Sequence, residues 1–280
     1  MIPHEMATVM ERRRLVAEVR TPTAVQALGV IDALAAAGVV TIEVSLAIPG
    51  AQEIISHFAA RQDVVVGAGS VLEPRQARDL ISCGARFIAS PIYAPDLVPV
   101  CRDANVTCIL GAFTPSEIIA AQRAGAEMVK LFPGEAIGGP AYIRALLRQL
   151  THVSLQVSGG ITAQNFGDYL TLPIRTLALG ELLVPPPLVD RGSWQAITNR
   201  ARAFVEFAMN PHAYAARFLS MMGVTPQPPA GAVAALRATP APRPTGQYPA
   251  VAGSAAPAPG QFKPWDSRPV GQSNEEDWLR

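Results

Sequence analysis

The chain has 280 residues, of which 49% are hydrophobic, and this is enough to build one large barrel or two small domains around an apolar core. Its formal net charge is +1, with 23 Lys and Arg against 22 Asp and Glu, so no broad basic surface is available for nucleic acid or an anionic membrane. The composition therefore excludes a chain that is disordered throughout and disfavours both of those partners.

Cysteines and histidines give no sign of a disulfide framework or a metal centre. The three cysteines are odd in number and lack C-x-x-C spacing, and the four histidines form neither an H-x-H nor an H-E-x-x-H pair. No apolar stretch fits a signal peptide or approaches the roughly 20 residues of a membrane span. We therefore expect a cytoplasmic protein that uses no metal and no other cofactor.

Eight short apolar, β-rich runs alternate with amphipathic helical stretches between residue 15 and about residue 183. The repeat of roughly 20 to 26 residues suits β/α units, and eight such units predict an α/β fold of the TIM-barrel type, (β/α)8. A doubly wound sheet gives similar local signals, so closure of the barrel is inferred from the number of strands alone. The runs cover residues 15–20, 39–46, 64–69, 87–90, 106–110, 128–132, 153–158 and 174–179.

Helices are predicted between these runs and after the last of them. The stretches 24–37 and 74–83 are rich in Ala and Leu, and glycines typical of helix ends stand at positions 38, 84 and 125. Two further helices, 193–208 and 212–222, are expected to complete or cap the barrel. The predicted barrel domain therefore covers residues 1–223.

The composition changes after residue 223. Residues 224–260 are dominated by Pro and Ala and predict a disordered linker. Residues 261–280 carry Phe262, Trp265 and Trp278, and aromatic residues after a polar linker are typical of a peptide that docks into the groove of a protein partner. A terminus that folds back on its own barrel or stays solvated is the alternative.

Lys130 is the only lysine upstream of this tail, and Lys263 is the other lysine of the chain. It lies inside the apolar run 127–133, where an amine can lose its proton and attack a carbonyl, which a guanidinium cannot do. A buried lysine that pairs with an acid for structural reasons is the alternative.

Chemistry in a TIM barrel gathers at the C-terminal ends of the strands. The predicted barrel brings Glu43 of the second strand to the same end as Lys130 of the sixth. Burial is expected to lower the pKa of the amine and raise that of the carboxyl, which suits nucleophilic attack and proton transfer near neutral pH. The other residues at this end are Arg20, Gly69, Ser70, Ser90, Pro91, Phe132, Ser158, Gly159 and Gly160.

The motifs at these strand ends resemble those of the 2-keto-3-deoxy-6-phosphogluconate (KDPG) and 4-hydroxy-2-oxoglutarate (KHG) aldolase family. The resemblance covers about residues 16 to 208, in order and at the spacing of the family. The matching segments are Arg20, I-E-V-S-L at 42–46, V-G-A-G-S-V-L at 66–72, A-S-P at 89–91, V-K-L-F-P-G-E at 129–135 and V-S-G-G-I at 157–161.

The resemblance implies a homotrimeric class I aldolase that acts on a small 2-keto acid. Lys130 would form an imine with the C2 carbonyl, and Glu43 would shuttle protons through water, so that cleavage between C3 and C4 gives pyruvate and an aldehyde. The positions that would contact the pyruvyl carboxylate, the hydroxyls and the carbon chain of the substrate are Arg20, Ser70, Pro91, Phe132 and Ser158.

A phosphate site is also implied by the resemblance, from the backbone of Gly159 and Gly160 together with a Gly-Ser pair after the eighth strand. This chain has Gly180 and Glu181 at that pair. A carboxylate in place of a hydroxyl donor repels a phosphate. The resemblance leaves KDPG and 4-hydroxy-2-oxoglutarate both open as substrate types, and Glu181 favours 4-hydroxy-2-oxoglutarate or another unphosphorylated 2-keto acid over the phosphorylated one.

Two other functions are open at this point. The barrel is in one of them a trimeric scaffold whose C-terminal tails bind a partner or direct it to an assembly, which the linker and the terminal tryptophans favour. The other is a phosphate-binding barrel such as an epimerase, which Glu181 opposes and which leaves Lys130 unexplained.

Overall fold

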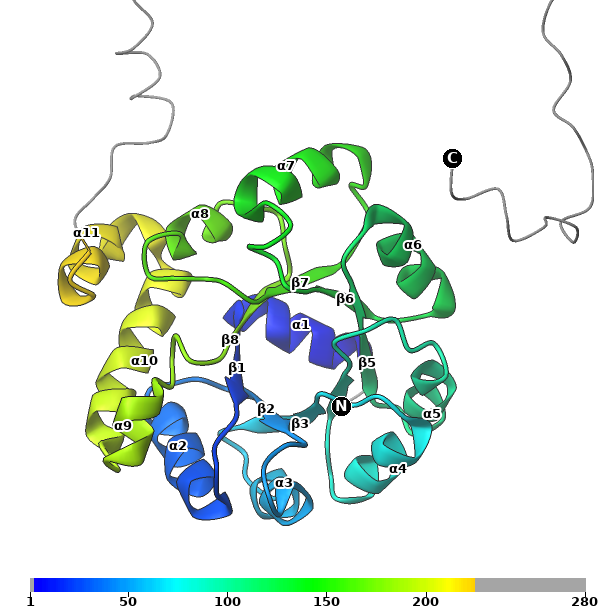
Figure 1. Cartoon of the computed structure of the whole chain (residues 1–280), viewed down its shortest axis with the longest axis horizontal. Helices are drawn as coiled ribbons and strands as arrows, with labels where there is room; N and C mark the ends of the chain where they lie inside the picture. Colours follow the sequence, from blue (N-terminus) through cyan, green and yellow to red (C-terminus); the bar gives the residue numbers. More distant parts are fainter. Residues whose placement is uncertain (1–2, 225–280) are drawn as a thin grey trace, which may run out of the picture. The chain divides into compact units, whose positions relative to one another are not determined.

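The computed structural model describes residues 3–224, in which eight parallel strands close into a barrel surrounded by helices (Figure 1). Each strand pairs with the next, and β8 pairs with β1. The predicted TIM barrel is confirmed and the doubly wound sheet is wrong. The strands are β1 (Leu15–Val19), β2 (Thr41–Ser45), β3 (Val65–Gly69), β4 (Phe87–Ala89), β5 (Thr107–Ala112), β6 (Met128–Leu131), β7 (Leu155–Ser158) and β8 (Thr176–Leu179).

Helices connect the strands, and α9, α10 and α11 follow β8, with α10 packed against α2 and α11. The helix ends predicted at three glycines are confirmed, because Gly38, Gly84 and Gly125 adopt φ angles of 87°, 101° and 101° after their helices. The helices are α1 (Pro3–Arg13), α2 (Ala24–Ala36), α3 (Ala51–Ala59), α4 (Pro74–Ser82), α5 (Leu97–Asp103), α6 (Pro115–Ala124), α7 (Gly139–Gln149), α8 (Phe166–Leu170), α9 (Pro186–Asp190), α10 (Trp194–Met209) and α11 (Pro211–Met221).

Side chains alternate between the two faces of each strand, and this alternation separates the core from the site. In β1, Leu15, Ala17 and Val19 belong to the large apolar cluster beneath the outer helices, whereas Val16 packs with Phe87 and Met128 inside the barrel. Because Glu18 lies two residues after Val16, it also points inward.

Helix α1 closes the N-terminal end of the barrel, a feature that the sequence analysis did not predict. Met6 and Met10, one turn apart, are buried against Val16, Phe87 and Met128 in the barrel interior. Figure 1 shows α1 lying across the centre of the strand ring. The opposite end, where the strands finish, is therefore left for the substrate.

None of the helices described between residues 3 and 224 is both long and apolar enough to span a bilayer. The predicted linker and the predicted docking peptide with Phe262, Trp265 and Trp278 lie outside the described residues.

Candidate active site

A cavity of about 710 Å³ lies at the C-terminal ends of the strands and brings together the predicted catalytic and substrate-binding residues, whereas Gly69 and Ser90, which were placed at the same end, are not among the residues that line it. The glycines of the predicted phosphate site also line it. The predicted residues in its wall are Arg20, Glu43, Ser70, Pro91, Lys130, Phe132, Ser158, Gly159, Gly160, Gly180 and Glu181.

Lys130 is held at the bottom of this cavity by two carboxylates. Its Nζ lies 2.9 Å from both Oε1 and Oε2 of Glu43 and 2.8 Å from Oε1 of Glu18. The side chains of Lys130 and Glu43 are each 6% exposed, whereas that of Glu18 is 27% exposed. The amine thus sits where a substrate can reach it from the mouth of the barrel while bulk water is largely excluded.

The strand order explains how these three groups meet. Glu18 and Glu43 are register partners on the neighbouring strands β1 and β2, so their side chains leave the sheet side by side. Lys130 stands on β6, on the other side of the strand ring (Figure 1), and its long side chain crosses the interior to reach them. Gly111 is its register partner on β5, which keeps that part of the wall free of side chain.

Gly69 at the end of β3 makes room for Glu43. A Cβ atom at residue 69 would lie 2.0 Å from Oε1 of Glu43, so only glycine leaves the carboxylate where it is. The position of Glu43 thus depends on a backbone feature of the adjacent strand as well as on its own.

The pKa of Lys130 is raised, and the expectation of a lowered value is wrong. Burial alone lowers the pKa of the amine, but the charges of Glu43 and Glu18 and the hydrogen bonds to both outweigh it. The expected change for Glu43 is found, because burial raises the pKa of its carboxyl and Glu18 adds to this, against the attraction of Lys130. The resting site therefore holds Lys130 as an ammonium in contact with Glu18 and Glu43.

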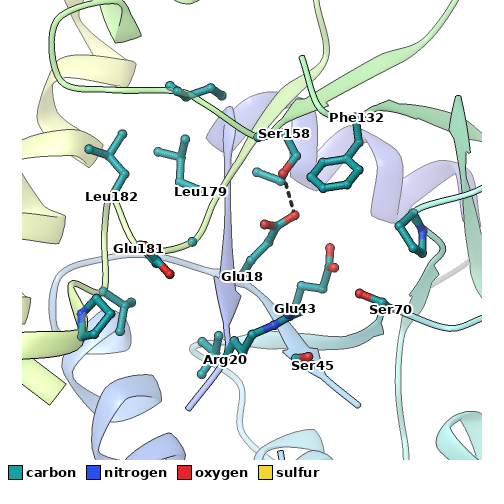
Figure 2. Close-up of a pocket in the computed structure, with 18 of the residues that line it drawn as sticks. Glu18, Arg20, Glu43, Ser45, Ser70, Phe132, Ser158, Leu179, Glu181 and Leu182 are labelled. Atoms are coloured by element: carbon teal, nitrogen blue, oxygen red, sulfur yellow. Dashed lines mark hydrogen bonds between the residues drawn. The ribbon is translucent and has the colours of Figure 1, made fainter. Parts of the chain in front are cut away.

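Glu18 was missed as a site residue. Burial tends to raise the pKa of its carboxyl, but the charge of Lys130, hydrogen bonds from Lys130 and Ser158 and the charge of Arg20 together lower it. Ser158 Oγ donates to Glu18 Oε1 at 2.9 Å, and Figure 2 shows this contact beside Glu43. The signal in the sequence was the spacing, because Glu18 lies two residues before Arg20 and must share its face of the strand.

The wall beside β7 and β8 is built from glycines and an aromatic ring. Gly159 and Gly160 adopt φ angles of 88° and 79°, and Phe132 packs beside Gly159. Behind Gly160 stands Glu135, whose Oε2 accepts hydrogen bonds from Tyr169 at 2.7 Å and Asn165 at 3.0 Å. This network fixes the loop after β6 against the loop after β7.

The cavity carries more negative than positive side chains. Its acidic residues are Glu18, Glu43, Glu181 and Asp190, and its basic residues are Arg20 and Lys130. Asp190, at the end of α9, and Ser45, at the end of β2, also line the cavity and were not predicted. Because like charges repel, this wall is poorly suited to an additional anion.

The comparisons with known proteins agree with this geometry. The KDPG and KHG aldolase family model matches residues 6–200. The 2-dehydro-3-deoxy-phosphogluconate aldolase of Pseudomonas aeruginosa is 32% identical over 180 residues, which are 64% of this chain and 82% of the relative. That of Treponema pallidum is 35% identical over 193 residues, 68% of this chain and 90% of the relative.

Solved structures of the same type resemble the described barrel. The KDPG aldolase of Legionella pneumophila, crystallised with pyruvate captured as a covalent carbinolamine, superposes with a TM-score of 0.65 at 27% identity. The alignment covers 71% of this chain and 97% of that one.

Proposed function

We propose that this chain, which belongs to the KDPG and KHG aldolase family, cleaves an unphosphorylated 2-keto-4-hydroxy acid through a Schiff base on Lys130. Membership of the family makes the protein a class I aldolase, a carbon–carbon lyase that yields pyruvate and an aldehyde. The observation that supports the roles of its own residues is the buried amine of Lys130, within 2.9 Å of the Glu43 carboxylate and open to the cavity.

The first step transfers a proton from the Lys130 ammonium to Glu43. Glu43 is the suitable acceptor because its pKa is raised, whereas that of Glu18 is lowered. The neutral amine attacks C2 of the substrate, the carbonyl π electrons move to oxygen, and Glu43 returns the proton to that oxygen. Loss of water from this carbinolamine gives the protonated imine.

Cleavage follows on the protonated imine. The Glu43 carboxylate, acting through water, takes the proton of the C4 hydroxyl, the C3–C4 bonding pair becomes the C2=C3 bond of an enamine, and the aldehyde leaves. Return of the proton to C3 regenerates the protonated imine, and addition of water releases pyruvate and restores the Lys130 ammonium. Glu18 remains a carboxylate beside the nitrogen throughout.

Arg20 is the best candidate partner for the carboxylate of the 2-keto acid. It follows β1 on the inward face, and with Lys130 it makes up the positive side chains of the cavity wall. Lys130 is bonded to C2 in the imine, so Arg20 is the free cationic side chain of the cavity wall that can pair with the carboxylate. Ser70 and Pro91 line the same cavity and complete this end of the pocket.

The absence of a phosphate on the substrate is supported by Glu181, which stands beside Gly180 in the cavity wall. The test is the release of pyruvate from 2-keto-3-deoxygluconate and from its 6-phosphate, which share one carbon chain. The parent protein is expected to prefer the unphosphorylated acid, and Lys130→Arg is expected to cleave neither. A preference for the phosphate ester would overturn this part of the proposal.

We also propose a homotrimer in the cytoplasm. Four large apolar side chains on the loops after β3, β4 and β5 are 40 to 52% exposed, as expected of a subunit interface: Leu72, Ile92, Tyr93 and Phe113. All three cysteines are free thiols, which suits a reducing compartment. Light scattering during size-exclusion chromatography tests the trimer, and Leu72→Glu is expected to weaken it.

A further inference from the structure

Two carboxylates face the part of the cavity between Lys130 and β8, where the aldehyde half of a substrate would lie. This inference rests on the proposed function, because it concerns the substrate of that same cavity. A Cβ atom added at Gly180 would lie 3.7 Å from Oε2 of Glu18, so this oxygen faces the loop after β8. The next residue of that loop, Glu181, is exposed, lines the cavity and extends toward Glu18 in Figure 2.

The oxygens that face this region are free to accept hydrogen bonds. Oε1 of Glu18 accepts hydrogen bonds from both Lys130 and Ser158. Among residues 3–224, no donor is found for Oε2 of Glu18 or for either oxygen of Glu181. Acceptors without donors at the wall of a binding cavity match a ligand that supplies hydroxyl groups.

The cationic side chains available to offset these carboxylates are already engaged. Lys130 becomes the imine nitrogen, and Arg20 is assigned to the carboxylate of the pyruvyl half. Arg200 of α10 donates its Nε to the carbonyl of Leu182 at 2.6 Å and does not line this cavity. Asp190 adds a further negative charge to the wall. A second anionic group on the substrate would therefore meet like charge and no free cationic side chain in this part of the cavity wall.

We propose that Glu18 and Glu181 select an aldehyde half that is uncharged and hydroxylated, and reject one that carries a phosphate or a second carboxylate. This preference restricts the class of substrate further than the absence of a phosphate does. It disfavours 4-hydroxy-2-oxoglutarate as well, because the aldehyde half of that acid is the anion glyoxylate. A 2-keto-4-hydroxy acid with a neutral polyhydroxy tail is the class that fits.

The experiment runs the enzyme in the condensation direction, with pyruvate and matched aldehydes. Glycolaldehyde and glyoxylate have two carbons each, and only glyoxylate is charged. Glyceraldehyde and glyceraldehyde 3-phosphate have three carbons each, and only the phosphate ester is charged. The parent kcat/KM is expected to favour the uncharged member of each pair by about tenfold or more. Glu18→Gln and Glu181→Gln are each expected to reduce this ratio several-fold, and added salt should reduce it for the parent.

The ratio isolates the aldehyde half of the reaction. Both members of a pair react with the same enamine, so any effect of Glu18→Gln on Lys130 itself cancels. Glu53→Gln removes a charge from the exposed first turn of α3, outside the cavity, and is expected to leave the ratio unchanged. If Glu18→Gln does not fold, the exposed Glu181→Gln carries the same test.

Equal rates with charged and uncharged aldehydes in the parent, or a ratio that neither variant changes, would overturn the inference. Glycolaldehyde should also react faster than acetaldehyde, and equal rates there would remove the role of the hydroxyl. Exchange of the pyruvate methyl protons with deuterium needs no aldehyde and is measured alongside. Exchange without charge discrimination defeats this inference alone, whereas no exchange defeats the proposed function too.

Discussion

Oε1 of Glu18 lies 2.8 Å from Nζ of Lys130, although the two residues are 112 positions apart in the chain. The same Nζ contacts Glu43, so one amine is shared by two carboxylates of adjacent strands. This relationship makes the two glutamates chemically unequal. Glu18 has a second donor in Ser158, whereas Glu43 accepts hydrogen bonds from Lys130 alone among residues 3–224.

Glu18→Gln is expected to make Lys130 a better nucleophile. The charge of Glu18 helps to raise the pKa of the amine, so removing it lowers that pKa and leaves more neutral amine at a given pH. The rate of pyruvate adduct formation, trapped with cyanoborohydride, should reach its half-maximum at a pH lower by about one unit or more. Glu18→Asp keeps the charge and serves as the control. An unchanged profile in Glu18→Gln would contradict the electrostatic role of Glu18.

Glu43→Gln is expected to separate adduct formation from proton transfer. Without the carboxyl group that accepts and returns the proton, exchange of the pyruvate methyl protons should fall by about 10²- to 10⁴-fold. Lys130 is still present, so a reducible pyruvate adduct should form, although slowly. Proton NMR in deuterium oxide follows the exchange. Exchange at the parent rate would assign proton transfer to another group.

Gly69→Ala is expected to displace Glu43 and to lower activity with it. The added methyl would lie 2.0 Å from Oε1 of Glu43, so the carboxylate has to move away from Lys130. A loss of about 100-fold in exchange rate is expected, by analogy with the effect of small displacements on catalysis. Gly167→Ala in α8, outside the cavity, is the control and should leave exchange intact. Equal activity of the two variants would show that Glu43 tolerates the displacement.

The barrel and most of its site were predictable because they follow from local patterns. Eight β-rich runs set the strands, and Arg20, Ser70 and Ser158 lie at their ends, where the fold itself gathers them. Lys130 was singled out because an amine inside an apolar strand is chemically unusual.

What escaped prediction depends on contacts between distant residues. In the sequence, Glu18 is a single charged residue in a short strand. Its place in the site depends on the register that sets it beside Glu43 and on the side chain of Lys130, which crosses the barrel to reach it. The raised pKa of Lys130 has the same origin, since two carboxylates together outweigh the effect of burial. The sequence analysis had paired Lys130 with Glu43 only. Helix α1 escaped because Met6 and Met10 are too few to form a periodic pattern, although both are buried.

Met10→Ala is expected to destabilise the barrel without disabling the site. Met10 is 0% exposed and packs inside the N-terminal end of the barrel, so its truncation leaves a cavity and should lower the free energy of unfolding by about 2 to 5 kcal/mol. Met221→Ala, at a methionine that is 51% exposed, should change it by less than about 0.5 kcal/mol. Urea unfolding measures both. Equal stability of the two variants would show that α1 does not close the barrel in solution.

The central claim is that Lys130 forms the Schiff base, and intact-mass spectrometry after incubation with pyruvate and borohydride tests it most directly. The chain has two lysines, so the parent, Lys130→Arg and Lys263→Arg suffice. A reduced pyruvyl adduct is expected on the parent and on Lys263→Arg and not on Lys130→Arg. An adduct that persists in Lys130→Arg, or none on the parent, would contradict the account.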